Sequence, residues 1–139
     1  MASLGRIHPL VIHFPIALML IAALAELIAT ITGRLYWRTV GVANVRVGAA
    51  FGVIAATAGW FLPRVLGLDS SALLEWHRWL GTLAASLIVV AALVSAGAER
   101  RSPTEFQLYR LTLFSAAALV AVTGHLGGLL VWGPGFFRP

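Results

Sequence analysis

Long apolar stretches dominate this sequence and constrain its fold more than any other feature. The stretches cover residues 9–32, 40–62, 77–98 and 103–132. Because about 20 apolar residues in a helix cross a bilayer core, each stretch is long enough to span a membrane. Backbone polar groups in hydrocarbon must bond within their own segment, which favours helices. We therefore predict an all-α integral membrane protein in which residues 1–139 form one four-helix bundle.

The composition agrees with a membrane protein. Hydrophobic residues make up 60% of the chain and charged residues 11%, whereas a soluble domain carries about 25% charged residues. The absence of cysteine excludes disulfides, cysteine-ligated iron–sulfur clusters and covalently attached haem. The ten basic residues are all arginines dispersed between apolar stretches, a pattern typical of headgroup anchors. We expect the lipid bilayer as a partner and no nucleic acid.

Several signals mark the ends of the predicted helices. Gly33 favours the left-handed conformation that terminates a helix. Residues 102–105, Ser-Pro-Thr-Glu, form a capping box with proline at the first position of the fourth helix. In the longest connection, residues 63–76, Asp69 and Ser70 offer an N-cap for a short surface helix. Every tryptophan falls near a predicted helix end, and no internal repeat is apparent.

The even number of spans places both termini on one side of the membrane. The first stretch is too long for a cleaved signal peptide, so we expect it to stay as an anchor. Arginines are more frequent around the first and third loops, which predicts that these loops are cytoplasmic and both termini periplasmic. The arginines on that side are Arg34, Arg38, Arg46, Arg100, Arg101 and Arg110.

The four histidines of the chain are His8, His13, His77 and His125. In the predicted topology they all lie in one leaflet, with His13 and His125 deeper than the other two at 1.5 Å per residue. Imidazole is the commonest metal ligand in proteins and is costly in hydrocarbon without a partner. Histidine near the headgroups needs no ligand, however, and spacing alone favours neither interpretation.

Small residues surround these histidines. Gly81 follows His77 by one helical turn, and Gly124 and Gly128 lie close to His125 in the sequence. Small residues permit close helix packing, and they equally leave room for a flat macrocycle between helices. The second apolar stretch carries a stripe of glycines at Gly41, Gly48, Gly52 and Gly59.

Glu26 and Arg46 are charged residues inside apolar stretches. Each lies about six residues from the loop that joins the first two helices, so we expect them at similar depth. Charges within a membrane bundle normally pair. The sequence predicts a structural ion pair, with a proton relay as the less favoured interpretation.

Two motifs are similar to those of a known family. Residues 8–17 read HPLVIHFPIA and residues 124–128 read GHLGG, while residues 76–81, WHRWLG, match less distinctively. Over essentially its whole length the chain resembles a bacterial inner-membrane family known only as domain of unknown function 2231. Members look like four-helix membrane modules, and some are joined to cytochrome c or Rieske domains. The resemblance implies redox work at the periplasmic face but assigns no reaction, and we expect any redox partner to be a separate molecule.

Our leading hypothesis is a b-type haem protein of the bacterial inner membrane. It would act as an electron-transfer component, not as a stand-alone enzyme, between the quinone pool and a periplasmic cytochrome c or other redox protein. Bis-histidine ligation needs no cysteine and suits the interior of a bundle. Depth predicts His13 with His125 as one axial pair and His8 with His77 as a second, so we expect one or two haems b. Gly81, Gly124 and Gly128 would make room for the macrocycle.

Two alternatives belong to other classes. The chain could be a structural or assembly subunit of a membrane complex or homodimer, docked through the glycine stripe of residues 40–62. It could instead bind a divalent metal such as zinc or copper through His8, His13, His77 and His125. A transporter is disfavoured because the predicted helix centres lack polar groups.

Overall fold

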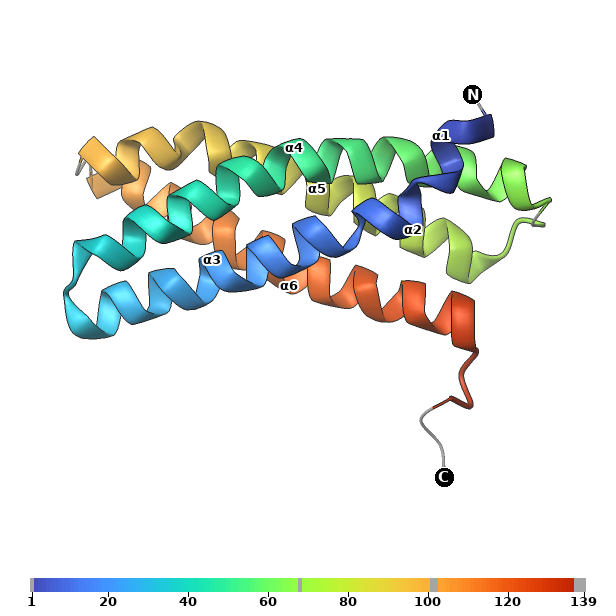
Figure 1. Cartoon of the computed structure of the whole chain (residues 1–139). Helices are drawn as coiled ribbons and strands as arrows, with labels where there is room; N and C mark the ends of the chain where they lie inside the picture. The colour runs from blue at the N-terminus through green and yellow to red at the C-terminus, as the bar shows by residue number, and fades with distance from the viewer. Residues whose placement is uncertain (1, 68, 101–102, 137–139) are drawn as a thin grey trace.

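The computed structural model describes residues 2–67, 69–100 and 103–136 (Figure 1). Among these residues, the helical stretches long and apolar enough to cross a membrane number four: Leu4–Thr32, Leu35–Leu66, Ala72–Ala96 and Pro103–Trp132. The predicted all-α membrane fold is confirmed. The helices are α1 (Ala2–Arg6), α2 (His8–Val11), α3 (His13–Thr32), α4 (Leu35–Leu66), α5 (Ala72–Arg100) and α6 (Pro103–Trp132).

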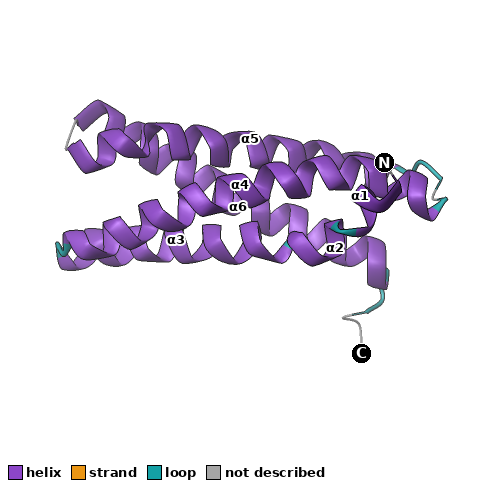
Figure 2. Cartoon of the chain, turned by 45° about the horizontal axis from the view of Figure 1, so that its top comes forward, coloured by secondary structure: helices purple, strands orange, loops and turns teal. Residues whose placement is uncertain are grey.

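The long helices form an up-and-down bundle. Each long helix packs against its neighbours in the chain, and α3 also contacts α6, which closes the ring. The short helix α1 lies against α4, so closely that a Cβ on Gly5 would stand 2.9 Å from the Leu62 Cα. Figures 1 and 2 show α1 and the end of α6 at the same end of the bundle as the connection between α4 and α5.

The first span, predicted over residues 9–32, lies at Leu4–Thr32 in the structure and is interrupted near its start. Helix α2 ends at Val11 and α3 begins at His13. Pro15 has no N–H to donate to the Val11 carbonyl, and its ring crowds that carbonyl. Pro9, by contrast, lies in the first turn of α2, where a missing N–H costs nothing. The two prolines therefore set His8 on a short helix with its own direction.

The connection between α4 and α5 is shorter than predicted. Helix α4 continues through Pro63 to Leu66, and α5 begins at Ala72. The Ser71 Oγ accepts a hydrogen bond of 3.2 Å from the Leu74 N–H, so the N-cap is Ser71 and not Asp69 or Ser70. The predicted surface helix is wrong, because its residues form the first turns of α5.

The other predicted boundaries fare better. Gly33 ends α3 with a φ of 68°, which confirms the predicted left-handed cap. Helix α6 begins at Pro103, as predicted. The capping serine of that helix, Ser102, lies outside the described residues.

The core of the bundle lies toward the connection between α3 and α4. On α6, every buried residue lies between Tyr109 and Val120, and residues 121–132 contribute none. Large side chains that are almost fully buried pack there from all four long helices: Met19, Val42, Val45, Ile88, Tyr109 and Leu113. The two ends of the bundle therefore differ in how tightly they are packed.

The glycine stripe of α4 faces the inside of the bundle. A Cβ on Gly41 would lie 3.2 Å from the Ala22 carbonyl oxygen, and one on Gly52 would lie 3.5 Å from the Ile88 Cδ1. These glycines allow helices of the same chain to approach one another. The alternative that this stripe forms an external docking surface is therefore wrong.

Candidate functional site

The structure brings together two of the four histidines. His8 on α2 and His77 in the second turn of α5 have ring centroids 6.4 Å apart, with ring planes at 84°. Both side chains are partly buried. They lie at the end of the bundle where α4 connects to α5, and we call them the histidine pair.

Each imidazole of the histidine pair is bonded to the backbone of a neighbouring helix. The His8 Nδ1 lies 2.8 Å from the Ala55 carbonyl oxygen on α4. The His77 Nδ1 lies 3.1 Å from the Thr123 carbonyl oxygen on α6. Because a carbonyl only accepts, Nδ1 carries the proton in both rings and Nε2 keeps its lone pair. Metal-ligating histidines typically have this arrangement, since the second bond fixes the tautomer and the ring orientation.

A glycine makes room for each ring. A Cβ on Gly59 would lie 2.9 Å from the His8 Cε1, and a Cβ on Gly127 would lie 3.0 Å from the His77 Cε1. Any side chain at either position would displace the imidazole. From the sequence, Gly59 belongs to the packing stripe of residues 40–62 and Gly127 lies beside His125, so neither is predicted to meet His8 or His77. The sequence signal for such a position is a glycine four residues after the residue whose carbonyl accepts the hydrogen bond. It can be recognised only when that carbonyl is already known.

The glycines predicted to border a cofactor lie elsewhere. A Cβ on Gly81 would meet the Thr123 side chain at 3.3 Å, and one on Gly124 would meet Ile16 at 3.6 Å. Gly128 faces open space, with nothing within 4 Å. Gly81 and Gly124 thus serve helix contacts, and none of the three meets an imidazole within that distance.

His13 and His125 have exposed side chains. Within the described part of the chain, no hydrogen bond or ring contact joins them to each other or to the histidine pair. Pro15 and Met19 mark the buried face of α3, and His13 lies on the opposite face. The prediction ranked the histidines by depth and did not consider the face to which each turns. A ligand role for His13 and His125 stays a prediction.

Aromatic and charged side chains tie α4 to α5 beside the histidine pair. The Trp60 Nε1 donates to the Thr82 hydroxyl at 3.0 Å. The Arg78 guanidinium lies 3.9 Å over the Trp60 ring, and Trp79 meets Trp60 edge-on at 5.3 Å. Such cation–π and aromatic contacts are typical of the membrane interface. Because Arg78 follows His77 directly, this cluster also fixes the helix that carries His77.

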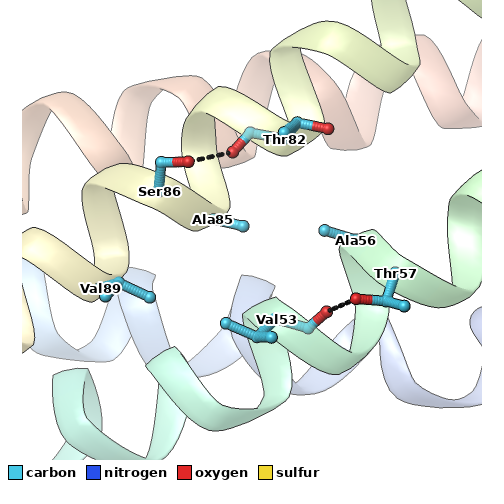
Figure 3. A pocket seen from close by; sticks show the side chains of 7 residues that line it. All are labelled: Val53, Ala56, Thr57, Thr82, Ala85, Ser86 and Val89. Atoms are coloured by element: carbon cyan, nitrogen blue, oxygen red, sulfur yellow. Dashed lines mark hydrogen bonds between the residues drawn. The ribbon is translucent and has the colours of Figure 1, made fainter.

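A shallow groove of about 330 Å³ runs between α4 and α5 (Figure 3). The hydroxyls of Thr57, Thr82 and Ser86 each bond to a carbonyl of their own helix, so the groove offers little polar chemistry. No histidine lines it; the lining residues are Val53, Ala56, Thr57, Thr82, Ala85, Ser86 and Val89. The groove is thus separate from the histidine pair.

The polar cluster at the opposite end differs from the predicted ion pair. Glu26 is fully buried and accepts two hydrogen bonds from Arg38, with Nε–Oε2 at 3.1 Å and Nη2–Oε1 at 3.3 Å. The Arg110 Nε lies 3.8 Å from the same carboxylate. Arg46 instead points toward α5, where its Nε donates to the Ser95 hydroxyl at 3.0 Å. The predicted Glu26–Arg46 pair is wrong because α4 begins at Leu35, five residues before the predicted start, so Arg38 lies level with Glu26 and Arg46 lies two turns further along the helix.

The fold and this end of the bundle define an α-helical integral membrane protein with a paired-histidine site. The chain belongs to the family described as predicted membrane protein (DUF2231), whose profile matches residues 6–136. No curated protein matches the chain, and no solved structure does. The family assignment confirms a membrane protein and leaves the use of the histidines to be argued from their geometry.

Proposed function

We propose that this protein binds one b-type haem, with His8 and His77 as its axial ligands. The distance between the two imidazoles carries the proposal. Metal–nitrogen bonds of about 2 Å on each side, added to the radius of each ring, separate the centres of two trans imidazoles by about 6 Å. The observed separation is 6.4 Å. The distance between the ring centres therefore matches that of two imidazoles that would hold one ion between them.

The number of ligands favours haem over a bare divalent metal. Zinc takes four protein or water ligands, three or more of them usually from side chains. Across the described residues, no group of three or more His, Asp or Glu side chains could hold a metal ion. Haem iron already has four nitrogens from the macrocycle and needs only two more. A pair of imidazoles is the set of ligands that haem requires.

The packing around the histidine pair also supports a cofactor. Helix α6 has no buried residue from position 121 to 132, although it carries His77's carbonyl partner and Gly127 in that segment. A membrane bundle commonly places cofactors between facing helices. When bound, haem supplies one-electron transfer at a potential set by its ligands and its burial. The chain's own part is to hold the two Nε2 atoms and to fix both rings through Nδ1.

The proposed topology determines which redox partners a haem at this site would reach. The arginine distribution supports periplasmic termini in a bacterial inner membrane. The histidine pair, α1 and the end of α6 share one end of the bundle (Figure 1). A haem there would exchange electrons with the quinone pool in the lipid and with a periplasmic cytochrome c or other redox protein. It would not by itself carry electrons across the whole membrane.

Absorption spectra of variants test this proposal. Protein expressed with ample haem and purified in detergent should show a Soret band and split α and β bands on reduction. His8→Ala and His77→Ala should each abolish those bands, whereas the matched variants His13→Ala and His125→Ala should keep them. A folded but colourless wild-type protein would overturn the proposal. Loss of the bands only in the His13 and His125 variants would move the haem to the pair predicted from depth.

A further inference from the structure

The contacts of His8 recur, atom for atom, at His77. In both cases Nδ1 bonds to a carbonyl on the long helix that follows the histidine's own span. For His8 this carbonyl lies on α4, 47 residues later, and for His77 it lies on α6, 46 residues later. In both cases a glycine follows that carbonyl by four residues, and Cε1 is the ring atom nearest to it. Two unrelated histidines would not be expected to have the same type of carbonyl partner, a glycine at the same spacing and the same ring atom nearest to that glycine. The repetition indicates that the chain contains the same arrangement twice.

Within the core, burial repeats with the same spacing. Several residues 69 apart on α3 and α5, or 68 apart on α4 and α6, are buried alike, and the histidines and the glycines are 69 and 68 apart. Four such pairs are at most 1% exposed. They are Met19 and Ile88, Ala22 and Ala91, Glu26 and Ser95, and Val45 and Leu113. Nearer the histidine pair the burial differs, since Ala58 is fully buried and Leu126, 68 residues later, is only partly buried.

The glycine beside each imidazole, Gly59 or Gly127, has a physical role. In a helix, the carbonyl of one residue accepts from the N–H four residues later, and one lone pair remains. A side chain on that later residue would crowd the approach to the free lone pair. Ala55 is followed at this position by Gly59, and Thr123 by Gly127. Both imidazoles reach a helix carbonyl because these two positions lack a Cβ.

We infer that the chain is built from two equivalent hairpins, α2–α3–α4 and α5–α6. The histidine pair is then one site on the approximate two-fold axis between them. Gly59 and Gly127 are positioning residues of this site. Since α3 and α5 run in the same direction, the axis runs along the bundle, as in parallel repeats of other membrane proteins. Each hairpin contributes one equivalent imidazole, so the site takes one ligand per chain. Only the identity of that ligand rests on the proposed function.

The hairpins differ where the first has extra elements. Helices α1 and α2 and the break at Ile12 precede α3, whereas α5 is continuous from Ala72. The repeated contacts use a backbone carbonyl and a missing side chain, so they leave little trace in residue identity. The two hairpins are therefore equivalent in their imidazole contacts and in the buried positions of the core, not in residue identity.

Nitrogen-15 NMR of the imidazoles, recorded without haem in nanodiscs, tests the inference directly. Wild-type protein should show two rings protonated at Nδ1, assigned by their loss in His8→Ala and His77→Ala. Gly59→Ala should shift the His8 ring and Gly127→Ala the His77 ring, with shifts of similar size. The controls are Gly52→Ala, which meets Ile88 at an ordinary 3.5 Å, and Gly128→Ala, which faces open space. Both controls should leave the two rings unchanged.

Haem titration supplies the second readout. Gly59→Ala and Gly127→Ala should each weaken binding at the same single site about tenfold, as loss of an outer-shell partner typically does. If one of the variants Gly59→Ala and Gly127→Ala had a large effect and the other had none, in either measurement, the two hairpins would not be equivalent. If the NMR result holds and no haem binds, the two-hairpin inference stands and the proposed function fails.

Cysteine cross-linking tests the inference independently of the glycine variants, should those fail to fold. Introduced cysteines would be the only thiols, because the chain contains no cysteine. His8→Cys combined with His77→Cys should form an intramolecular cross-link with a short thiol reagent. His13→Cys combined with His77→Cys should not. Cross-linking of the second pair but not the first would overturn the single site between the hairpins.

Discussion

The two ends of the bundle satisfy their polar groups in opposite ways. At one end Glu26 is fully buried and its partners are side chains, Arg38 and Arg110. At the other end the imidazoles of His8 and His77 bond to backbone carbonyls. The Glu26 end lies next to the core, whereas residues 121–132 of α6 include no buried residue. The Glu26 end therefore holds the bundle together, and the less tightly packed histidine end is where we propose a ligand.

The difference has an energetic basis. A buried carboxylate that loses its cations, or cations that lose their carboxylate, leave an uncompensated charge in a poorly solvated place. An imidazole that leaves a helix carbonyl breaks one hydrogen bond, and that carbonyl keeps its partner within the helix. Substitutions at the Glu26 end should therefore change stability, and those at the histidine end should change ligand binding.

The largest effect on stability is expected from Glu26→Gln. The change leaves Arg38 and Arg110 without their anion, and both guanidiniums are largely buried. We expect a loss of about 2–3 kcal/mol in the free energy of unfolding, measured by denaturant titration in micelles with circular dichroism. The double variant Glu26→Gln with Arg38→Gln should recover part of the loss. The haem bands of folded Glu26→Gln should match those of the wild type, and their disappearance would contradict the separation of the two ends.

A smaller effect distinguishes glycines at the two ends. In Gly41→Ala the new Cβ would lie 3.2 Å from the Ala22 carbonyl oxygen, so this variant should lose stability. In Gly128→Ala the Cβ meets nothing within 4 Å, and the better helix propensity of alanine should add about 0.5–1 kcal/mol. Thermal unfolding of both variants in the same micelles measures the contrast. Equal changes in the two variants would show that packing at the ends does not differ.

The sequence predicts the spans well because apolar length and helix caps are local properties. The fourth helix and the Gly33 cap lie where they are predicted. The break before His13 is harder to place, because it depends both on two prolines six residues apart and on the packing of α1 against α4.

The partners of polar side chains depend on where each helix begins and on its direction, which apolar runs define only roughly. Glu26 meets Arg38 and not Arg46 because α4 begins earlier than the apolar run predicts, which leaves Arg46 two turns further along the helix. His8 meets His77 because the short α2 changes its direction ahead of α3. The internal duplication is invisible in residue identity, since Ala55 and Thr123 contribute only their carbonyls.

The electron paramagnetic resonance spectrum of the ferric protein tests the central claim most directly. The angle between two axial imidazole planes controls the anisotropy of a low-spin ferric haem signal, and the planes of His8 and His77 are 84° apart. We expect a single, highly anisotropic low-spin species, one per chain, that disappears in His8→Ala and in His77→Ala. A low-spin signal that persists in the double variant His8→Ala with His77→Ala would contradict this expectation.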